Sequence, residues 1–157
     1  MDFNDLENYL TSLPDTILDD AAEIVAETAT EYYKERFREK AFDGNPWAPA
    51  KVPRQNGSLL INSGSLLNSI RPAYIGRDKV IVSAGNDKVD YAETHNEGYT
   101  GPVVVPAHVR RTRKYGDVKV REHTRRANIP KRQFMGKSEE LADDIHKRLE
   151  EYINTLK

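Results

Sequence analysis

The stretch of sequence that decides the fold is PDTILDDAAEIVAETATEYYKERFREK, from Pro14 to Lys40. Its apolar residues recur every three or four positions between Ile17 and Phe37, a spacing typical of one face of an α-helix. Proline suits the first position of a helix, and bases occur only in the last seven residues of the stretch, as the helix dipole favours. The sequence therefore predicts one long helix over residues 14–40.

A second helix is predicted near the other end of the chain, from Ser138 to about Thr155. Ser138 is a favoured N-cap residue, although Leu141 stands where a capping box would have glutamate or glutamine. The apolar stripe of this helix consists of Leu141, Ile145, Leu149, Tyr152 and Ile153. A short amphipathic turn is also expected around Leu6, Tyr9 and Leu10.

A long loop and a short helix are expected after the first helix. Residues 42–49 are rich in turn-forming residues and contain the only tryptophan, so we expect Trp47 to anchor this segment onto the core. Residues 51–57 are predicted to form an exposed polar loop. Residues 62–70 predict a short helix that Ser63 or Ser65 caps, with Pro72 marking its end.

The middle of the chain predicts short strands and one more helix. Residues 71–75 and 79–84 are expected to pair as a hairpin, and residues 103–105 and 129–135 to form two further strands. Residues 91–98 predict a short helix that Gly98 closes in a left-handed C′ position.

Residues 107–124 predict a hairpin with an unusual surface. Tyr115 and Gly116 suit a two-residue turn, which pairs Arg110 with Arg121 and places His108 opposite His123. No face of this hairpin is consistently apolar, so we expect it to project from the domain as an arm. Because an isolated two-stranded ribbon is marginally stable, such an arm needs something that packs on it.

Together these elements predict one α+β domain. A long N-terminal helix and a C-terminal helix pack on a small, mostly antiparallel sheet, from which a basic β-hairpin arm protrudes. The expected regions are an acidic helical region over 1–40, a loop, short helix and strands over 41–106, the basic arm over 107–126, and a strand with the closing helix over 127–157.

The formal net charge of −1 hides an uneven distribution of charge. Residues 1–31 contain nine acids and no base, whereas residues 107–137 contain eleven bases and two acids. This pattern indicates either a nucleic-acid surface or two complementary surfaces on one molecule. The basic surface consists of Arg110, Arg111, Arg113, Lys114, Arg121, Arg125 and Arg126, and the acidic counter-surface of Asp15, Asp19, Asp20, Glu23 and Glu27.

Composition excludes several classes of protein. The 157 residues include no cysteine, which rules out disulfides, thiolate metal sites and cysteine nucleophiles. No apolar run approaches the roughly 18 residues of a membrane span. Residues 1–10 carry three acids and no base, a pattern unlike that of a signal peptide. We therefore expect a soluble, intracellular type of domain.

The sequence contains no recognisable catalytic motif. His95 stands between Glu93 and Glu97, but these three positions do not share one face of a helix, so they do not predict a metal site. His108 opposite His123 is a weak zinc signal, because only two ligands come together. The serines of residues 63–69 have no neighbouring base that would activate a hydroxyl. We expect no catalytic residue, no bound metal and no cofactor.

Four segments carry a resemblance to a known family. They are Pro46-Trp47-Ala48-Pro49, the leucine-serine segment 59–70, Tyr91-Ala92-Glu93-Thr94-His95-Asn96-Glu97-Gly98, and Ile129-Pro130-Lys131-Arg132-Gln133-Phe134-Met135-Gly136. In this order they resemble the tailed-bacteriophage virion morphogenesis family, whose members include Mu-like morphogenesis, tail completion and head–tail joining proteins. The resemblance spans roughly residues 30–157. It implies a structural role for Trp47, Tyr91, Gly98, Pro130 and Phe134.

The resemblance implies a non-enzymatic virion protein of the neck or tail end, assembled in the host cytoplasm. Its expected partners are further copies in a ring, neighbouring neck or tail proteins and DNA passing nearby, with no membrane. The alternative is a nucleic-acid-binding module whose basic arm contacts phosphates. A steep fall of DNA affinity with salt would favour that alternative.

Overall fold

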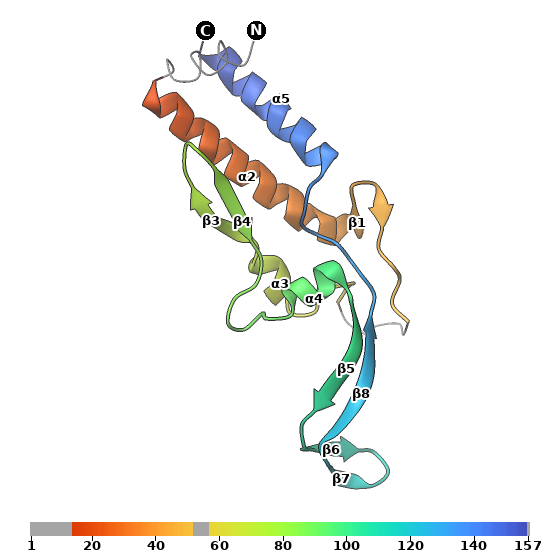
Figure 1. The fold of residues 1–157 in the computed structure, drawn as a ribbon. Helices are drawn as coiled ribbons and strands as arrows, with labels where there is room; N and C mark the ends of the chain where they lie inside the picture. The colour runs from red at the N-terminus through yellow and green to blue at the C-terminus, as the bar shows by residue number, and fades with distance from the viewer. Residues whose placement is uncertain (1–13, 52–56, 157) are drawn as a thin grey trace.

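Two long helices form one end of the molecule. The structure, a computed structural model, describes residues 14–51 and 57–156; the turn expected around Leu6, Tyr9 and Leu10 lies outside them. Helix α2 (Asp15–Glu39) and helix α5 (Glu139–Thr155) lie side by side and run in opposite directions (Figure 1). Both predicted helices are confirmed. Pro14, however, is the N-cap residue of α2, outside the first turn in which we expected it.

The start of α5 is held by an acid from a distant part of the chain. The Ser138 hydroxyl accepts a hydrogen bond from the Leu141 amide at 3.1 Å, as an N-cap does. Asp43 Oδ1 then accepts from the Ser138 hydroxyl at 2.8 Å and from the Glu140 amide at 3.3 Å. Asp43 thus satisfies an N-terminal amide that no side chain of α5 itself reaches. The hydrogen bond from Ser138, and to a smaller extent that from the Glu140 amide, lowers the pKa of the Asp43 carboxyl.

The strands form four separate two-stranded antiparallel ribbons, so the α+β class is confirmed but no continuous sheet exists among the described residues. The first ribbon is short and follows α2, and the second lies along α2 (Figure 1). The predicted hairpin around residues 76–78 is this second ribbon. The ribbons pair β1 (Ala41–Phe42) with β2 (Asn45–Pro46), β3 (Arg71–Ile75) with β4 (Val80–Ser83), β5 (Tyr99–Val105) with β8 (His123–Ile129), and β6 (His108–Thr112) with β7 (Gly116–Val120).

One short helix precedes the second ribbon, and another connects the second ribbon to the third. Helix α3 (Ser65–Asn68) has Gly64 as its N-cap residue, with φ of 78°, and no side chain caps it. The prediction that Ser63 or Ser65 caps this helix is therefore wrong. Ser63 and Ser65 instead hydrogen-bond each other through their hydroxyls, so neither closes the helix. Helix α4 (Ala92–Glu97) lies in the predicted segment and ends at Gly98.

The main core lies where α2, α3 and the segment after β8 meet. Phe37, Leu66, Ile70 and Phe134 are almost fully buried. Trp47 is 8% exposed, packs edge-on against Phe37 with ring centroids 5.6 Å apart, and donates from Nε1 to the Gln133 carbonyl at 2.6 Å. The prediction that Trp47 anchors its loop onto the core is confirmed.

The strand predicted over residues 129–135 does not form: β8 ends at Ile129, and residues 130–135 are not in a strand. The backbone amides of Phe134 and Met135 both donate to the Asn96 side-chain oxygen, at 2.9 and 3.0 Å. Arg132 is buried and donates to the carbonyls of Ala48 and Pro49. Since side chains satisfy this backbone, no neighbouring strand is needed, and the apolar alternation of the segment reflects anchoring in the core.

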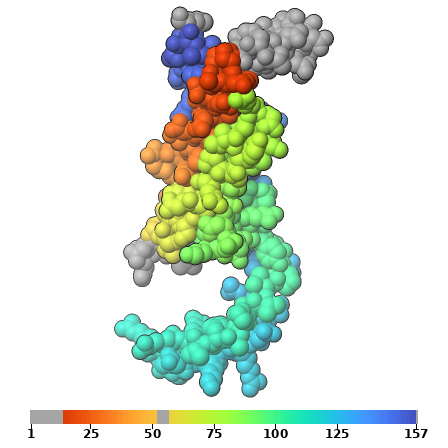
Figure 2. Space-filling view, turned by 90° about the vertical axis from the view of Figure 1, so that its left-hand side faces the viewer, coloured from red at the N-terminus to blue at the C-terminus, as the bar shows by residue number. Residues whose placement is uncertain are grey.

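The third and fourth ribbons extend away from the helices (Figure 1). β5 and β8 leave the region of α4, and β6–β7 lies across their far end, where both views show the chain turning aside (Figures 1 and 2). The predicted strand 103–105 is the last part of the longer β5.

The register of the terminal hairpin differs from the prediction. Thr112 pairs with Gly116, so the loop is residues 113–115 and not a two-residue turn at Tyr115 and Gly116. Arg110 therefore lies opposite Val118 and not opposite Arg121. His108 lies opposite Val120 and His123 opposite Val105, so the two histidines are not paired across strands.

Candidate assembly surfaces

The basic surface lies on the two projecting ribbons and the loops that join them. All seven predicted basic residues are exposed, and none makes an ion pair within the part of the chain that the structure describes. Successive residues of a strand point to opposite faces. On β6, Arg110 and Arg111 therefore lie on opposite faces of the terminal hairpin. On β8, Arg125 and Arg126 lie on opposite faces of the longer ribbon. The positive charge is therefore spread over both faces of the ribbons and exceeds the charge of their two acids, Asp117 opposite Arg111 and Glu122 beside Arg121.

The predicted acidic surface is partly used inside the fold. Arg77, in the β3–β4 turn, forms ion pairs with Asp19 at 2.6 Å and with Asp15 at 2.9 Å. The hydrogen bond from Arg77 lowers the pKa of the Asp19 carboxyl. Asp20 accepts a hydrogen bond from the Tyr152 hydroxyl of α5 at 2.6 Å. These three acids hold the hairpin and α5 onto α2.

The remaining two acids are not used in this way, although Glu27 lies close enough to Arg148 to help Glu31, the hydrogen-bond partner of that guanidinium, raise its pKa. Glu23 and Glu27 are exposed and form no ion pair within the described residues. They are four residues apart on α2, so they lie on neighbouring turns of the same helix face. Figures 1 and 2 show the beginning of α2 at one end of an elongated molecule and the β6–β7 hairpin at the other. The acidic and basic surfaces therefore cannot meet within one molecule.

The predicted structural residues lie between these two ends. Phe134 is in the core with Trp47, and Tyr91 packs edge-on against His95 with ring centroids 5.6 Å apart. Gly98 has φ of 77° as expected, but its ψ of 165° is not that of the left-handed helical C′ position that we predicted. A Cβ at Gly98 would lie 2.8 Å from the Lys131 amide nitrogen, so the chain approaches too closely for a side chain. Pro130 stands just after β8, at the point where strand pairing stops.

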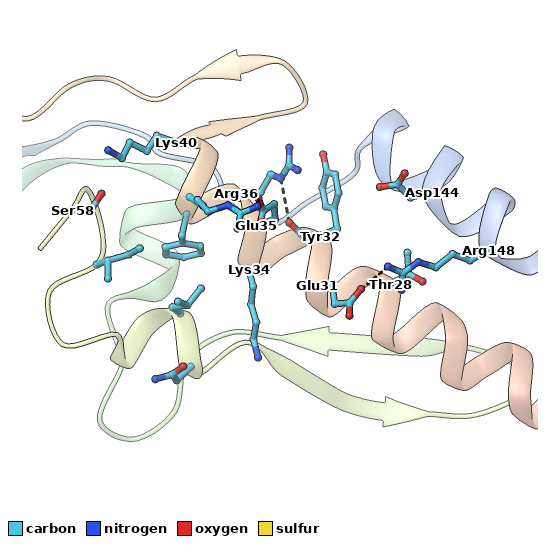
Figure 3. Close-up of a pocket in the computed structure, with 15 residues that line it drawn as sticks. Thr28, Glu31, Tyr32, Lys34, Glu35, Arg36, Lys40, Ser58, Asp144 and Arg148 are labelled. Carbon is cyan, nitrogen blue, oxygen red and sulfur yellow. Dashed lines mark hydrogen bonds and ion pairs between the residues drawn. The ribbon is translucent and has the colours of Figure 1, made fainter.

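A groove of about 980 Å³ runs along α2 (Figure 3). Apolar side chains such as Phe37, Ile61 and Leu67 line it together with charged ones from α2 and α5. Arg148 pairs with Glu31 of the groove at 2.6 Å, drawn as a dashed line in Figure 3, whereas Arg36 pairs with Glu39 and Glu140, which lie outside the lining.

The hydroxyl groups of this groove serve the fold. The Thr28 hydroxyl donates to the Ile24 carbonyl at 2.6 Å, and the Tyr32 hydroxyl bonds Ser138 and Glu140. The hydrogen bond of Thr28 thus lies within α2, and those of Tyr32 connect α2 to the start of α5.

Histidine and carboxylate groups do not gather into a metal site in the described ranges, where no three of them come together. Glu97, beside His95 in sequence, pairs instead with Lys131 at 3.4 Å. His108 and His123 both line a small hollow between the two projecting ribbons, together with Arg110 and Arg125. This hollow could not be predicted from the sequence, because its shape depends on how one ribbon lies across the other. Within residues 14–51 and 57–156, no helix is long and apolar enough to cross a membrane.

The helical body carries exposed acids and the projecting ribbons carry exposed bases, so the molecule has two surfaces of opposite charge. The sequence profile of the phage virion morphogenesis family matches residues 1–154, so the chain belongs to that family. The resemblance seen in the four sequence motifs is thereby confirmed and extends over the first helix as well. No curated protein and no solved structure matches the chain significantly. The protein is thus a phage virion-associated protein with a structural or assembly role.

Proposed function

We propose that the protein is a structural component of the neck or tail end of a tailed phage, a tail completion or head–tail joining protein. It assembles into a ring of copies in the host cytoplasm and docks onto neighbouring virion proteins. It performs no catalysis, and it works by contact between surfaces. The observation that carries the proposal is that the exposed bases of the projecting ribbons lie far from Glu23 and Glu27, exposed acids of α2 that form no ion pair among the described residues.

This separation favours contacts between unlike surfaces. A head-to-tail interface joins one surface of a copy to a different surface of the next, and such contacts close into rings when the rotation permits. The exposed glutamates of α2 and the unpaired bases of the ribbons supply two unlike surfaces that attract. A neck protein also has to dock onto other virion proteins, for which an extended ribbon offers a long contact area.

The projecting ribbons have the properties of a surface that a partner covers. Two-stranded ribbons are marginally stable alone, and these leave Val104 and Val109 each 61% exposed. A single exposed ion pair contributes only about 0–1 kcal/mol, so no one arginine can hold an assembly. Several pairs together with burial of these valines give a stable contact, which should weaken with salt because salt screens exposed charges.

Charge reversal on the ribbon tests the proposal. The triple variant Arg110→Glu, Arg111→Glu, Arg113→Glu should fold like the wild type, because none of the three side chains is buried, yet sediment as a monomer. The matched control reverses three exposed bases of the body, Arg71, Lys88 and Lys147, and should keep the assembled state. Analytical ultracentrifugation at low and high salt measures both. An assembly that persists unchanged in the ribbon variant would show that the ribbon is not the interface.

A further inference from the structure

A hollow of about 360 Å³ lies where the β6–β7 hairpin crosses the end of the β5–β8 ribbon. We call it the elbow hollow; its lining residues are Val105, His108, Arg110, Val120, His123 and Arg125. Four of these six side chains are basic, and no acid is among them. Two valines supply the only other lining. A concave surface of this composition attracts anions.

The strand register explains why these side chains converge. His108, Arg110 and Val120 point to one face of the terminal hairpin, because His108 and Val120 are partners and Arg110 is two residues further along β6. Val105, His123 and Arg125 share one face of the longer ribbon in the same way. The two faces meet at the hollow because one ribbon lies across the end of the other. Backbone ladders therefore fix the positions from which all four basic side chains start.

The ring nitrogens of the two histidines are oriented by the backbone. Nδ1 of His108 bonds the Pro106 carbonyl at 2.9 Å, and Nδ1 of His123 bonds the Arg121 carbonyl at 3.0 Å. Because a carbonyl oxygen only accepts, each Nδ1 carries the proton and donates, which leaves Nε2 for a ligand.

Two ligand classes use histidine Nε2, and the arginines decide between them. A divalent cation needs neutral imidazoles and tolerates poorly the two unpaired guanidinium groups of Arg110 and Arg125 beside it. A tetrahedral oxyanion accepts hydrogen bonds on all sides, and guanidinium groups match its oxygens in pairs. The convergence of donors from two ribbons fits such an anion better than it fits a planar carboxylate with two oxygens.

We propose that the elbow hollow binds a phosphate group, with Arg110 and Arg125 as its donors and with His108 and His123 lining the hollow beside them. The phosphate comes either from a nucleic-acid backbone or from the free anion, since both present the same oxygens. The site does not depend on ring assembly, because every residue that forms it comes from one chain.

Titration with inorganic phosphate at constant ionic strength, followed by ¹H–¹⁵N NMR, tests the site. We expect saturable shifts at Val105, His108, Val120 and His123 in the wild type. The double variant Arg110→Gln, Arg125→Gln should weaken phosphate binding by at least about tenfold for each arginine, as expected for loss of a hydrogen bond to a charged group. The matched control Arg111→Gln, Arg126→Gln removes the same charge from the opposite faces of the same strands and should bind phosphate within about twofold of the wild type.

A short DNA duplex distinguishes the two sources of phosphate. Competition of the duplex with phosphate for the same shifts, lost in the Arg110 and Arg125 variant but kept in the control, identifies the ligand as a backbone phosphodiester. Phosphate binding without competition by DNA identifies the free anion, and the site stands in both cases. Equal weakening in both double variants would overturn the proposal, because it would show a diffuse charge effect. Binding of Zn²⁺ with no binding of phosphate would overturn it too.

Discussion

Replacing Trp47 by alanine should destabilise the protein more than any other single change in the loop after α2. The indole is 8% exposed, packs on Phe37 and hydrogen-bonds the Gln133 carbonyl. The substitution removes a large buried ring and leaves the Gln133 carbonyl without this donor. Truncation of a buried aromatic side chain lowers the free energy of unfolding by about 3–5 kcal/mol. For a chain of this length each 1 kcal/mol lowers the melting temperature by about 2–4 °C, so we expect a fall of roughly 6–20 °C.

Trp47→Phe separates the two contributions of the indole. Phenylalanine keeps a ring against Phe37 but cannot donate to the Gln133 carbonyl, so it should cost less than the alanine variant. Because Trp47 is the only tryptophan, unfolding has to be followed by circular dichroism and not by indole fluorescence. An alanine variant within about 1 kcal/mol of the wild type would refute the assignment of Trp47 to the core, since such a value is typical of a surface site.

Three further predictions concern the way the elements are joined. Gly98→Val should impair folding, measured by soluble yield and circular dichroism, because a Cβ would meet the Lys131 amide and φ is positive; Ala92→Gly, in the same short helix, should remain folded. The lowered pKa of Asp43 means that its contribution to stability is present above about pH 4 and is lost as the pH falls through its folded pKa. Asp43→Asn should therefore flatten the fall of stability in acid, and an unchanged pH profile would contradict the assigned hydrogen bonds. Arg77→Ala should loosen the β3–β4 turn and speed amide hydrogen exchange there, whereas Lys79→Ala, in the same hairpin but without an ion pair to α2, should not.

The helices were predictable because their signals are local. The apolar spacing from Ile17 to Phe37 and the cap at Ser138 depend only on neighbouring residues, and both helices lie where the sequence indicates. Trp47 was predictable for a similar reason, since a lone tryptophan between prolines has few alternatives to burial.

Two of the errors involve contacts between residues far apart in sequence or a choice between turns, whereas those at Pro14, at the cap of α3 and at Gly98 concern the ends of helices. The alternating pattern of residues 129–135 is that of a strand, but Asn96 satisfies the amides that a strand would pair. In the terminal hairpin, Gly116 with φ of 61° closes a three-residue loop, and the Thr112 side chain accepts from the Tyr115 amide at 3.0 Å. The choice of turn moves every cross-strand pair, so one local difference changed the whole predicted register.

The candidate surfaces were predictable as charge but not as geometry. The acidic and basic segments are visible in the sequence. The ion pairs of Arg77 with Asp15 and Asp19 are not, because the partners are about sixty residues apart. The elbow hollow was also invisible, because it depends on one ribbon lying across another.

The central claim is that unlike ends of neighbouring copies attract, and a mixing experiment tests it most directly. One variant carries Arg110→Glu, Arg111→Glu and Arg113→Glu, and a second carries Glu23→Lys and Glu27→Lys. Each variant alone weakens one of the two attracting surfaces and should sediment as a monomer: the first leaves five bases and five acids on residues 107–126, and the second places lysines at two exposed acids of α2 that form no ion pair among the described residues. When the two are mixed in equal amounts, the unaltered helix of the first meets the unaltered ribbon of the second, and the new lysines of the second meet the new glutamates of the first. The account predicts that association returns only in the mixture; a mixture that stays monomeric, or a single variant that still assembles, would contradict it.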